Sequence, residues 1–127
     1  MVVVYRDRHC PVCTRYLGDL NAMLPKLTEL GIDLVVVSAD PQEKAANQID
    51  PIAPTYAVGY DLTIEQMQAL GSYISHPHSA TETDRPFAEP GLVVVNADDN
   101  LQVTDISNVP FARPDFTGHG AWVHSQP

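Results

Sequence analysis

The chain has 127 residues and a mass of 13.9 kDa. This size indicates one domain, which can fold without stabilising disulfide bonds. Hydrophobic residues make up 44% and charged residues 18% of the sequence, which is typical of a globular chain and excludes intrinsic disorder. Seven basic residues against 16 acidic ones give a formal charge of −9. A surface of that sign repels phosphate backbones and anionic headgroups, so binding to nucleic acid or membrane is disfavoured.

The start of the chain bears on its compartment. Arg6 and Arg8 follow the apolar N-terminal run instead of preceding it, so no signal peptide is recognised, and we expect a cytoplasmic protein. We interpret residues 1–127 as a single domain. Because the strand-like pattern begins at the first residue, we consider two alternatives to a native N-terminus: the chain is trimmed there, or the fold itself is reduced at that end.

The first half of the chain alternates between strand and helix patterns. Residues 1–5 are β-branched or apolar and predict a buried strand. Pro11 suits the first position of a helix, and Gly31 suits its C-terminal cap. A second buried strand is predicted over 34–37. The apolar stripe between the proline and the glycine, spaced as in a helix lying on a sheet, consists of Tyr16, Leu17, Leu20, Met23, Leu24, Leu27 and Leu30.

Capping residues predict the next two helices. Asp40, followed by Pro41, is expected to cap a short helix, and residues 55–60 fit a short edge strand. Residues 63–66, Thr-Ile-Glu-Gln, form a capping box that opens a helix ending near Gly71.

The second half reads as a long loop followed by a hairpin. Residues 75–89 are polar and are expected to be loop, and 92–95 form a third buried strand. The turn 96–100 leads into 101–106, whose alternation predicts a half-exposed strand. Any final helix after Pro110 is expected to be weak. The alternation of elements predicts an α/β layer whose first strands are parallel and joined by right-handed crossovers.

The two cysteines carry the strongest chemical signal. Cys10 stands where the first strand pattern gives way to a helix, and unpaired N–H groups at a helix N-terminus stabilise a thiolate. The cationic neighbours Arg8 and Arg15, and His9 when protonated, favour the same ionised form. Cys13 lies three residues further on, one turn into the helix, within reach of Cys10. The pair is therefore predicted to form a redox couple in which Cys10 attacks and Cys13 resolves.

Residues 5–13 read aromatic-Arg-x-x-x-C-P-x-C, an element that resembles the peroxiredoxin-like branch of the alkyl hydroperoxide reductase/thiol-specific antioxidant (AhpC/TSA, redoxin) family. Three later segments resemble the same branch, at 62–67, 89–92 and 105–114. The resemblance implies a thioredoxin-like α/β fold with a central mixed sheet flanked by helices, and the C-x-x-C at the N-terminus of the first long helix. It also implies that Pro90 is a cis-proline that faces the cysteines and lines a substrate groove. Pro11 and Val12, between the cysteines, would tune the redox potential.

Departures from the peroxiredoxin pattern favour dithiol–disulfide exchange over a peroxidase. Aligned on that pattern, Cys13 takes the peroxide-attacking position, Cys10 replaces a threonine or serine, and Arg6 replaces a proline. The arginine expected before the later strand is not matched, because residues 88–90 are Ala-Glu-Pro, and Arg85 is the nearest substitute. The first strand contains no carboxylate that could act as a buried base for Cys13.

Two other functions remain open at this point. The first is a full peroxidase that reduces hydrogen peroxide or alkyl hydroperoxides. The second is a non-catalytic metal-binding or interaction module, in which Cys10 and Cys13 share zinc with His76 and His78, or with His119 and His124. The redox interpretation needs no cofactor or metal. Its partners would be a protein disulfide or peroxide and a reducing system such as thioredoxin or glutathione, and an incomplete last helix makes a homodimer plausible.

Overall fold

The computed structural model describes residues 1–6, 11–77 and 84–108, without the side chains of residues 11–13. The expected order of strands and helices is confirmed over this part of the chain, except for two short strands, β4 and β5, that the sequence did not predict. The elements are β1 (Val2–Val4), α1 (Pro11–Glu29), β2 (Val35–Val37), α2 (Gln42–Ile49), β3 (Ala57–Gly59), α3 (Ile64–Ala69), β4 (Ile74–Ser75), β5 (Phe87–Ala88), β6 (Gly91–Val95) and β7 (Leu101–Ile106).

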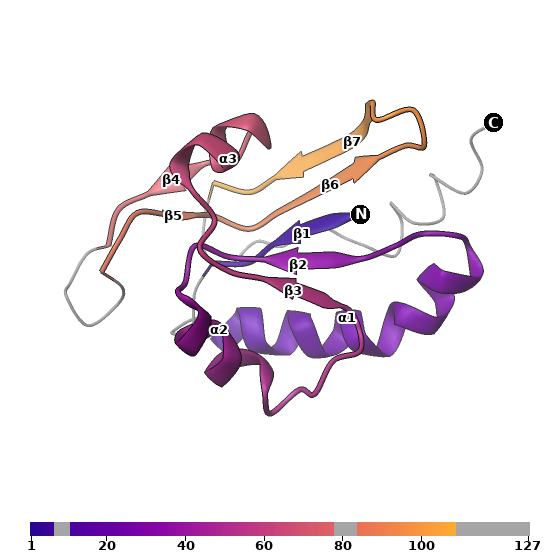
Figure 1. The fold of residues 1–127 in the computed structure, drawn as a ribbon, viewed down its shortest axis with the longest axis horizontal. Helices are drawn as coiled ribbons and strands as arrows, with labels where there is room; N and C mark the ends of the chain where they lie inside the picture. The colour runs from indigo at the N-terminus through magenta and orange to yellow at the C-terminus, as the bar shows by residue number, and fades with distance from the viewer. Residues whose placement is uncertain (7–10, 78–83, 109–127) are drawn as a thin grey trace.

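A mixed five-stranded sheet with the order β3-β2-β1-β6-β7 forms the centre of the domain (Figure 1). The strands β1, β2 and β3 are parallel to one another, as the alternating pattern predicts. On the other side of β1, β6 pairs with it antiparallel, and β7 then pairs antiparallel with β6. Val3 in the middle of β1 therefore lies between Val36 of β2 and Leu92 of β6.

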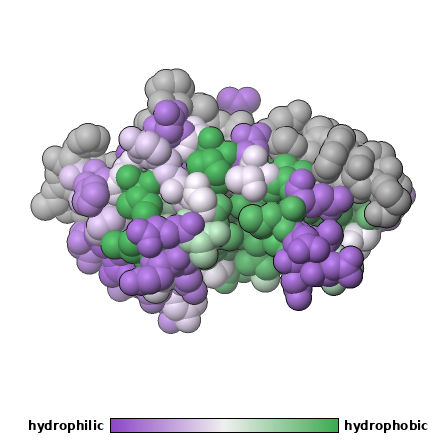
Figure 2. Space-filling model, turned by 90° about the horizontal axis from the view of Figure 1, so that it is seen from above, coloured by the Kyte–Doolittle hydropathy of each residue, from purple (hydrophilic) through white to green (hydrophobic). Residues whose placement is uncertain are grey.

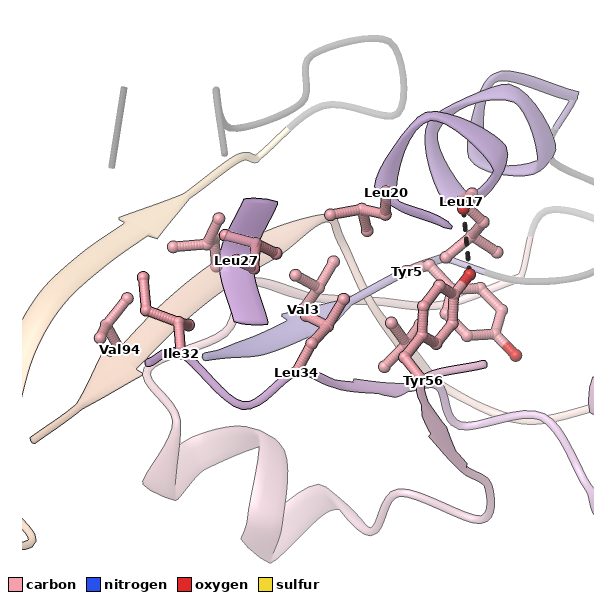
Figure 3. Close-up of a cluster of buried hydrophobic side chains, with 11 residues drawn as sticks. Val3, Tyr5, Leu17, Leu20, Leu27, Ile32, Leu34, Tyr56 and Val94 are labelled. Atoms are coloured by element: carbon pink, nitrogen blue, oxygen red, sulfur yellow. Dashed lines mark hydrogen bonds between the residues drawn. The ribbon is translucent and has the colours of Figure 1, made fainter. Parts of the chain in front are cut away.

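One face of the sheet packs against α1 (Figure 3). Ile49, at the end of α2, packs against the same cluster. Leu17, Leu20 and Leu27 of the predicted apolar stripe are completely buried there. The buried members of this core are Val3, Tyr5, Leu17, Leu20, Leu27, Ile32, Leu34, Val36, Tyr56, Leu92 and Val94. Figure 1 shows α1 and α2 together on one side of the strands. The core thus fixes the helix that begins with the C-x-x-C element.

The opposite face carries a smaller core under α3. Val4 of β1 packs there with Met67 of α3 and Phe87 of β5, and each is about 1% exposed. The central strand β1 is therefore covered on both faces, which explains its uninterrupted apolar sequence.

Helix ends follow the predicted caps in two cases. Gly31 has a φ of 75°, and the N–H groups of Gly31 and Ile32 donate to the carbonyls of Thr28 and Leu27 at 3.0 and 2.9 Å, which is a Schellman motif. The capping box at Thr63 is also confirmed: its hydroxyl accepts from the Gln66 N–H, and the Gln66 side chain accepts from the Thr63 N–H.

The expectation that Asp40 caps the second helix is wrong. The helix begins at Gln42, its N-cap is Pro41, and no side chain caps it. Asp40 is only 2% exposed and lies in the segment that leaves β2. The sequence pattern of a cap was present, but the helix starts one residue later than the pattern indicates, so Asp40 lies one position before the N-cap.

The predicted loop over 75–89 is also partly wrong. Short strands β4 and β5 pair antiparallel at its two ends, with Ile74 opposite Ala88 and Ser75 opposite Phe87. Two-residue strands leave too little alternation for a sequence pattern to detect. Residues 78–83, and the tail over 109–127, lie outside the described residues.

Part of the surface is apolar and is bordered by hydrophilic residues. Val35, Val95 and Leu101 are 40%, 40% and 59% exposed, and Figure 2 shows hydrophobic residues gathered between hydrophilic ones on the side of the molecule at the top of Figure 1. Within the described part of the chain, no helix has the length and apolar character needed to cross a bilayer.

Replacing Thr63 by alanine removes the side-chain half of the capping box. We expect the free energy of unfolding to fall by about 1 kcal/mol, measured by urea denaturation. The exposed Thr55, in the loop before β3, provides the matched control, and Thr55→Ala should change stability by less than about 0.5 kcal/mol. Equal losses in both variants would show that the capping box contributes nothing specific.

Candidate active site

The parallel strands bring three segments of the chain to one edge of the sheet. Arg6 follows β1, residues 38–40 follow β2, and Tyr60 and Asp61 follow β3. Because parallel strands end at the same edge, these segments lie together, at the position where ligands bind in open α/β sheets. The chain from β1 also leads directly into α1. The cysteine element is therefore attached to this edge.

The helix that carries the cysteine element begins where the sequence predicts. Pro11 is its first residue, Cys13 is its third, and its first turn contains no acidic residue that would oppose a thiolate. Arg8, His9 and Cys10 lie outside the described residues, and the side chains of residues 11–13 are not described. The distance between the two sulfur atoms, their reactivity and the tuning roles of these neighbours stay predictions. Arg15 is exposed on α1, and its tuning role also stays a prediction.

Contacts from α2 and from Tyr56, the residue before β3, hold the first half of α1 in place. The hydroxyl of Tyr56 donates to the Leu17 carbonyl at 3.0 Å (Figure 3), and the Gln48 amide donates to the Thr14 hydroxyl. Burial, and to a smaller extent the nearby Tyr5, raises the pKa of Tyr56 to about 12. The phenol is therefore a neutral, permanent donor at physiological pH. These bonds fix the helix just after its cysteine-bearing turn.

The segment after β2 is buried and cross-linked to the segment after β3. Ser38 is completely buried, and Asp40 is nearly so. The N–H groups of Asp61 and Leu62 donate to the carbonyls of Asp40 and Ser38 at 2.8 and 3.0 Å. These bonds continue the contact between the two segments beyond the ends of β2 and β3, so the two segments are held together at this edge of the sheet.

Arg85, the nearest substitute for the arginine that the family pattern leads one to expect, lies at the surface of the same edge. Its guanidinium is 2.9 Å from carboxylate oxygens of both Asp61 and Asp84, and it donates to the Ala39 carbonyl at 3.4 Å. The hydrogen bond from Arg85 lowers the pKa of Asp84. Arg85 also lines an open hollow of about 550 Å³ beside α3. Arg85 therefore links the segment before β5 to this edge of the sheet, and its guanidinium forms ion pairs with two carboxylates.

The structure adds a buried ion pair that the sequence analysis missed. Glu89, which directly follows β5, is 3% exposed, and its carboxylate lies within 3.4 Å of the Arg6 Nε. The first strand itself holds no carboxylate, but the connection between β5 and β6 supplies one close to its end. The available signal was a glutamate two residues before a buried strand and four residues downstream of Arg85. Its partner could be named only once the pairing of β1 with β6 was known.

The prediction that Pro90 is cis is wrong. The described residues contain no cis peptide bond, so the bond from Glu89 to Pro90 is trans, the usual state even before proline. Pro90 is buried, and its carbonyl accepts from the Ser107 N–H at 2.8 Å. In the continued register of β1 and β6, Pro90 lies opposite Tyr5, where its missing N–H ends the ladder. Whether Pro90 lines a substrate groove stays a prediction.

Comparison with known proteins defines the class of this chain. The family model described as AhpC/TSA matches residues 1–104, and the chain therefore belongs to the AhpC/TSA family. Its fold is thioredoxin-like, as the sequence resemblance implies. A search of the curated proteins found no match.

Solved structures that share this fold have low sequence identity to the chain. A cysteine-to-serine mutant of the peroxiredoxin 6 of Arenicola marina is 16% identical with a TM-score of 0.76, and the match covers 98% of this chain and 59% of that one. A peroxiredoxin-like protein from Aquifex aeolicus is 15% identical with a TM-score of 0.76, covering 96% and 68%. The Xanthomonas campestris bacterioferritin comigratory protein is 17% identical with a TM-score of 0.71, covering 98% and 73%. The chain thus spans less than two thirds of the peroxiredoxin 6.

The hydrogen bond from Tyr56 to α1 can be tested with Tyr56→Phe. We expect the variant to lose about 1 kcal/mol of unfolding free energy at neutral pH, because the Leu17 carbonyl loses a buried donor. The folded-state pKa of about 12 lies above the ordinary value near 10. The neutral phenol therefore contributes stability that is present below pH ~10 and is lost as the pH rises towards ~12.

The measurement is urea denaturation at neutral pH and at pH ~11. The wild type should lose more stability on alkalinisation than Tyr56→Phe does. The control is Tyr60→Phe, which removes the hydroxyl of a tyrosine that is 46% exposed and should leave the alkaline loss unchanged. An equal alkaline loss in the wild type and Tyr56→Phe would contradict the assigned role of this phenol.

Proposed function

We propose that the chain is a thiol–disulfide oxidoreductase that uses Cys10 and Cys13 as a dithiol/disulfide couple. The observation that carries the proposal is the start of α1 at Pro11, between the two cysteines, on a helix that follows a central parallel strand. Unpaired N–H groups and the helix dipole stabilise a thiolate at such a position, and the absence of acidic residues from the first turn leaves that effect unopposed.

The proposed reaction consists of two thiol–disulfide exchanges. The Cys10 thiolate attacks one sulfur of a substrate disulfide, forms a mixed disulfide and releases the other substrate sulfur as a thiolate. Cys13 then loses its proton to solvent, attacks the Cys10 sulfur and releases the second substrate thiolate. The substrate gains two electrons, and the protein is left with a Cys10–Cys13 disulfide. A dithiol reductant of the thioredoxin type, or glutathione, restores the starting state.

Peroxide reduction is the alternative function, and family membership favours it. The bacterioferritin comigratory protein with the same fold is described with alkyl peroxide reduction activity. In that reaction the Cys10 thiolate would attack a peroxide oxygen, giving a sulfenic acid and an alcohol or water. Cys13 would then form the disulfide and release water. We favour disulfide exchange because Cys10 stands where the peroxidase pattern has a hydroxyl residue, and because residues 88–90, Ala-Glu-Pro, do not match the arginine expected before the later strand.

The proposal extends to tuning residues, partners and place of action. His9, Arg8 and Arg15 would stabilise the thiolate, while Pro11, Val12 and Pro90 would shape the potential and the substrate groove. The substrates would be protein disulfides, and the setting would be cytoplasmic redox homeostasis with an antioxidant effect. A charge of −9 disfavours nucleic acid and anionic membranes as partners. A homodimer is compatible with this function.

The variants Cys10→Ser and Cys13→Ser test the assignment of roles. Each is assayed for insulin reduction with dithiothreitol and for peroxide consumption coupled to thioredoxin and its reductase. Cys10→Ser should fall to the rate of the protein-free control, because the attacking sulfur is absent. Cys13→Ser should complete the first exchange and accumulate a mixed disulfide, visible by mass spectrometry.

The reverse pattern would assign the attack to Cys13 and restore the peroxiredoxin alignment. Coupled peroxide consumption in the wild type without insulin reduction would favour the peroxidase. Failure of both assays, together with stoichiometric zinc in the purified protein, would contradict redox chemistry and favour a metal-holding module.

A further inference from the structure

We propose that the open hollow beside α3 is a docking site for an extended segment of a partner protein, in which an apolar residue lies next to a lysine or arginine. The hollow has a volume of about 550 Å³ and is lined from within residues 61–67 and 84–86. The inference goes beyond the proposed redox function, because it concerns an interaction surface that includes neither cysteine.

The hollow lies where the connection from β3 to α3 meets the segment before β5. The Leu62 N–H donates to the Ser38 carbonyl at 3.0 Å, and the Arg85 guanidinium donates to the Ala39 carbonyl at 3.4 Å. Both sides of the hollow are therefore attached to the segment that follows β2. Figure 1 shows α3 and β5 at this end of the sheet. The hollow is thus part of the edge at which the parallel strands finish.

Apolar side chains form much of the lining. Met67 of α3 and Leu62 are buried, at 1% and 9% exposure, and both contribute to the hollow. Ile64, the first residue of α3, lines it as well, but is 43% exposed. Covering exposed apolar surface with another apolar group is favourable, because the surface leaves water. The hollow therefore suits an aliphatic side chain.

The charged part of the lining has an excess of negative charge. The carboxylates of Asp61 and Asp84 each lie 2.9 Å from the guanidinium of Arg85, and all three side chains line the hollow. Among the neighbouring charges, Glu65 in the first turn of α3 adds to the excess, and Lys44 of α2, which acts electrostatically on Asp84, reduces it. An anionic ligand would be repelled by the two carboxylates, so a cationic residue is favoured beside the aliphatic one.

The guanidinium of Arg85 has one nitrogen left for a ligand. Its Nε donates to Asp84, and its Nη1 donates to Asp61 and to the Ala39 carbonyl. No described residue accepts a hydrogen bond from Nη2. A neutral carbonyl oxygen suits this donor, because the two carboxylates already compensate the guanidinium charge. An extended peptide presents carbonyl groups beside its side chains, which favours a protein segment over an isolated amine.

Asp61 is held in place before any partner binds. Its φ is 54°, in the left-handed region that aspartate and asparagine tolerate better than most residues. Its N–H donates to the Asp40 carbonyl at 2.8 Å, and its carboxylate accepts from Arg85 at 2.9 Å. A side chain fixed in advance loses less conformational entropy on binding. Asparagine fits the same backbone, so the charge at position 61 can be removed without adding strain.

The test is an NMR titration of the reduced, isotope-labelled chain with three hexapeptides that are blocked at both ends. Their central pairs are leucine–lysine, leucine–glutamate and alanine–lysine. The leucine–lysine peptide should shift the amide signals of Leu62, Met67 and Arg85. At low salt it should bind about fivefold more tightly than the leucine–glutamate peptide, because of its charge. It should also bind about fivefold more tightly than the alanine–lysine peptide, which lacks the larger aliphatic group.

The double variant Asp61→Asn, Asp84→Asn tests the charge. The two carboxylate side chains are 54% and 66% exposed, so the variant should fold. It removes both carboxylate partners of the Arg85 guanidinium, and the leucine–glutamate peptide should then bind more tightly than the leucine–lysine peptide. Raising the salt to ~300 mM should reduce the preference of the wild type, because salt screens exposed charges.

Ile64→Ser should weaken binding of both leucine peptides. Its matched control is Leu101→Ser, which alters an exposed leucine on β7 and should leave binding unchanged. Equal affinity for the leucine–lysine and leucine–glutamate peptides in the wild type, or shifts confined to other amides, would overturn the inference. Equally tight binding of isopentylamine, which has the aliphatic group and the cation but no carbonyl, would indicate a small-molecule site and overturn it too. Shifts of the same amides with protein concentration alone would assign the hollow to a second copy of the chain, against the proposal.

Discussion

The double coverage and double pairing of β1 is the constraint on which the rest of the structure depends. Three valines pair on one side with β2 in parallel and on the other with β6 antiparallel. Val3 and Val4 point into different cores, and both are essentially inaccessible to solvent. A strand held in this way has no freedom of register, because a slip by one residue would exchange its two faces. The start of α1 is consequently held at a defined corner of the sheet.

The same register determines which charges meet at that corner. Continued past Pro90, it sets Arg6 against Glu89 over the ring of Phe87. The two charges thus come from the residues that flank β1 and β6, which are 83 positions apart in the sequence. Family membership is shown by the match over residues 1–104. A glutamate before β6 nevertheless gives this chain a different charge arrangement from the one that the peroxidase pattern leads one to expect.

Sequence patterns predicted the elements that depend on local chemistry. The apolar runs of β1, β2 and β6, the first residue of α1 and the capping box at Thr63 all appear as expected. The errors occur where tertiary contacts decide. Asp40 is buried and lies one position before the N-cap of α2, and the pairing of β4 with β5 joins residues across a long connection. The partner of Glu89 is likewise a non-local fact, since it lies 83 positions earlier in the chain.

The central claim is that Cys10 and Cys13 interconvert between a dithiol and a disulfide within one chain. The most direct measurement is equilibration of the wild type in glutathione redox buffers, followed by acid trapping, alkylation and peptide mapping by mass spectrometry. The account predicts a single two-electron transition in which the peptide that contains both cysteines loses two hydrogens and resists alkylation. Cysteines that stay fully alkylatable under oxidising buffers, or that form disulfides only between chains, would contradict it.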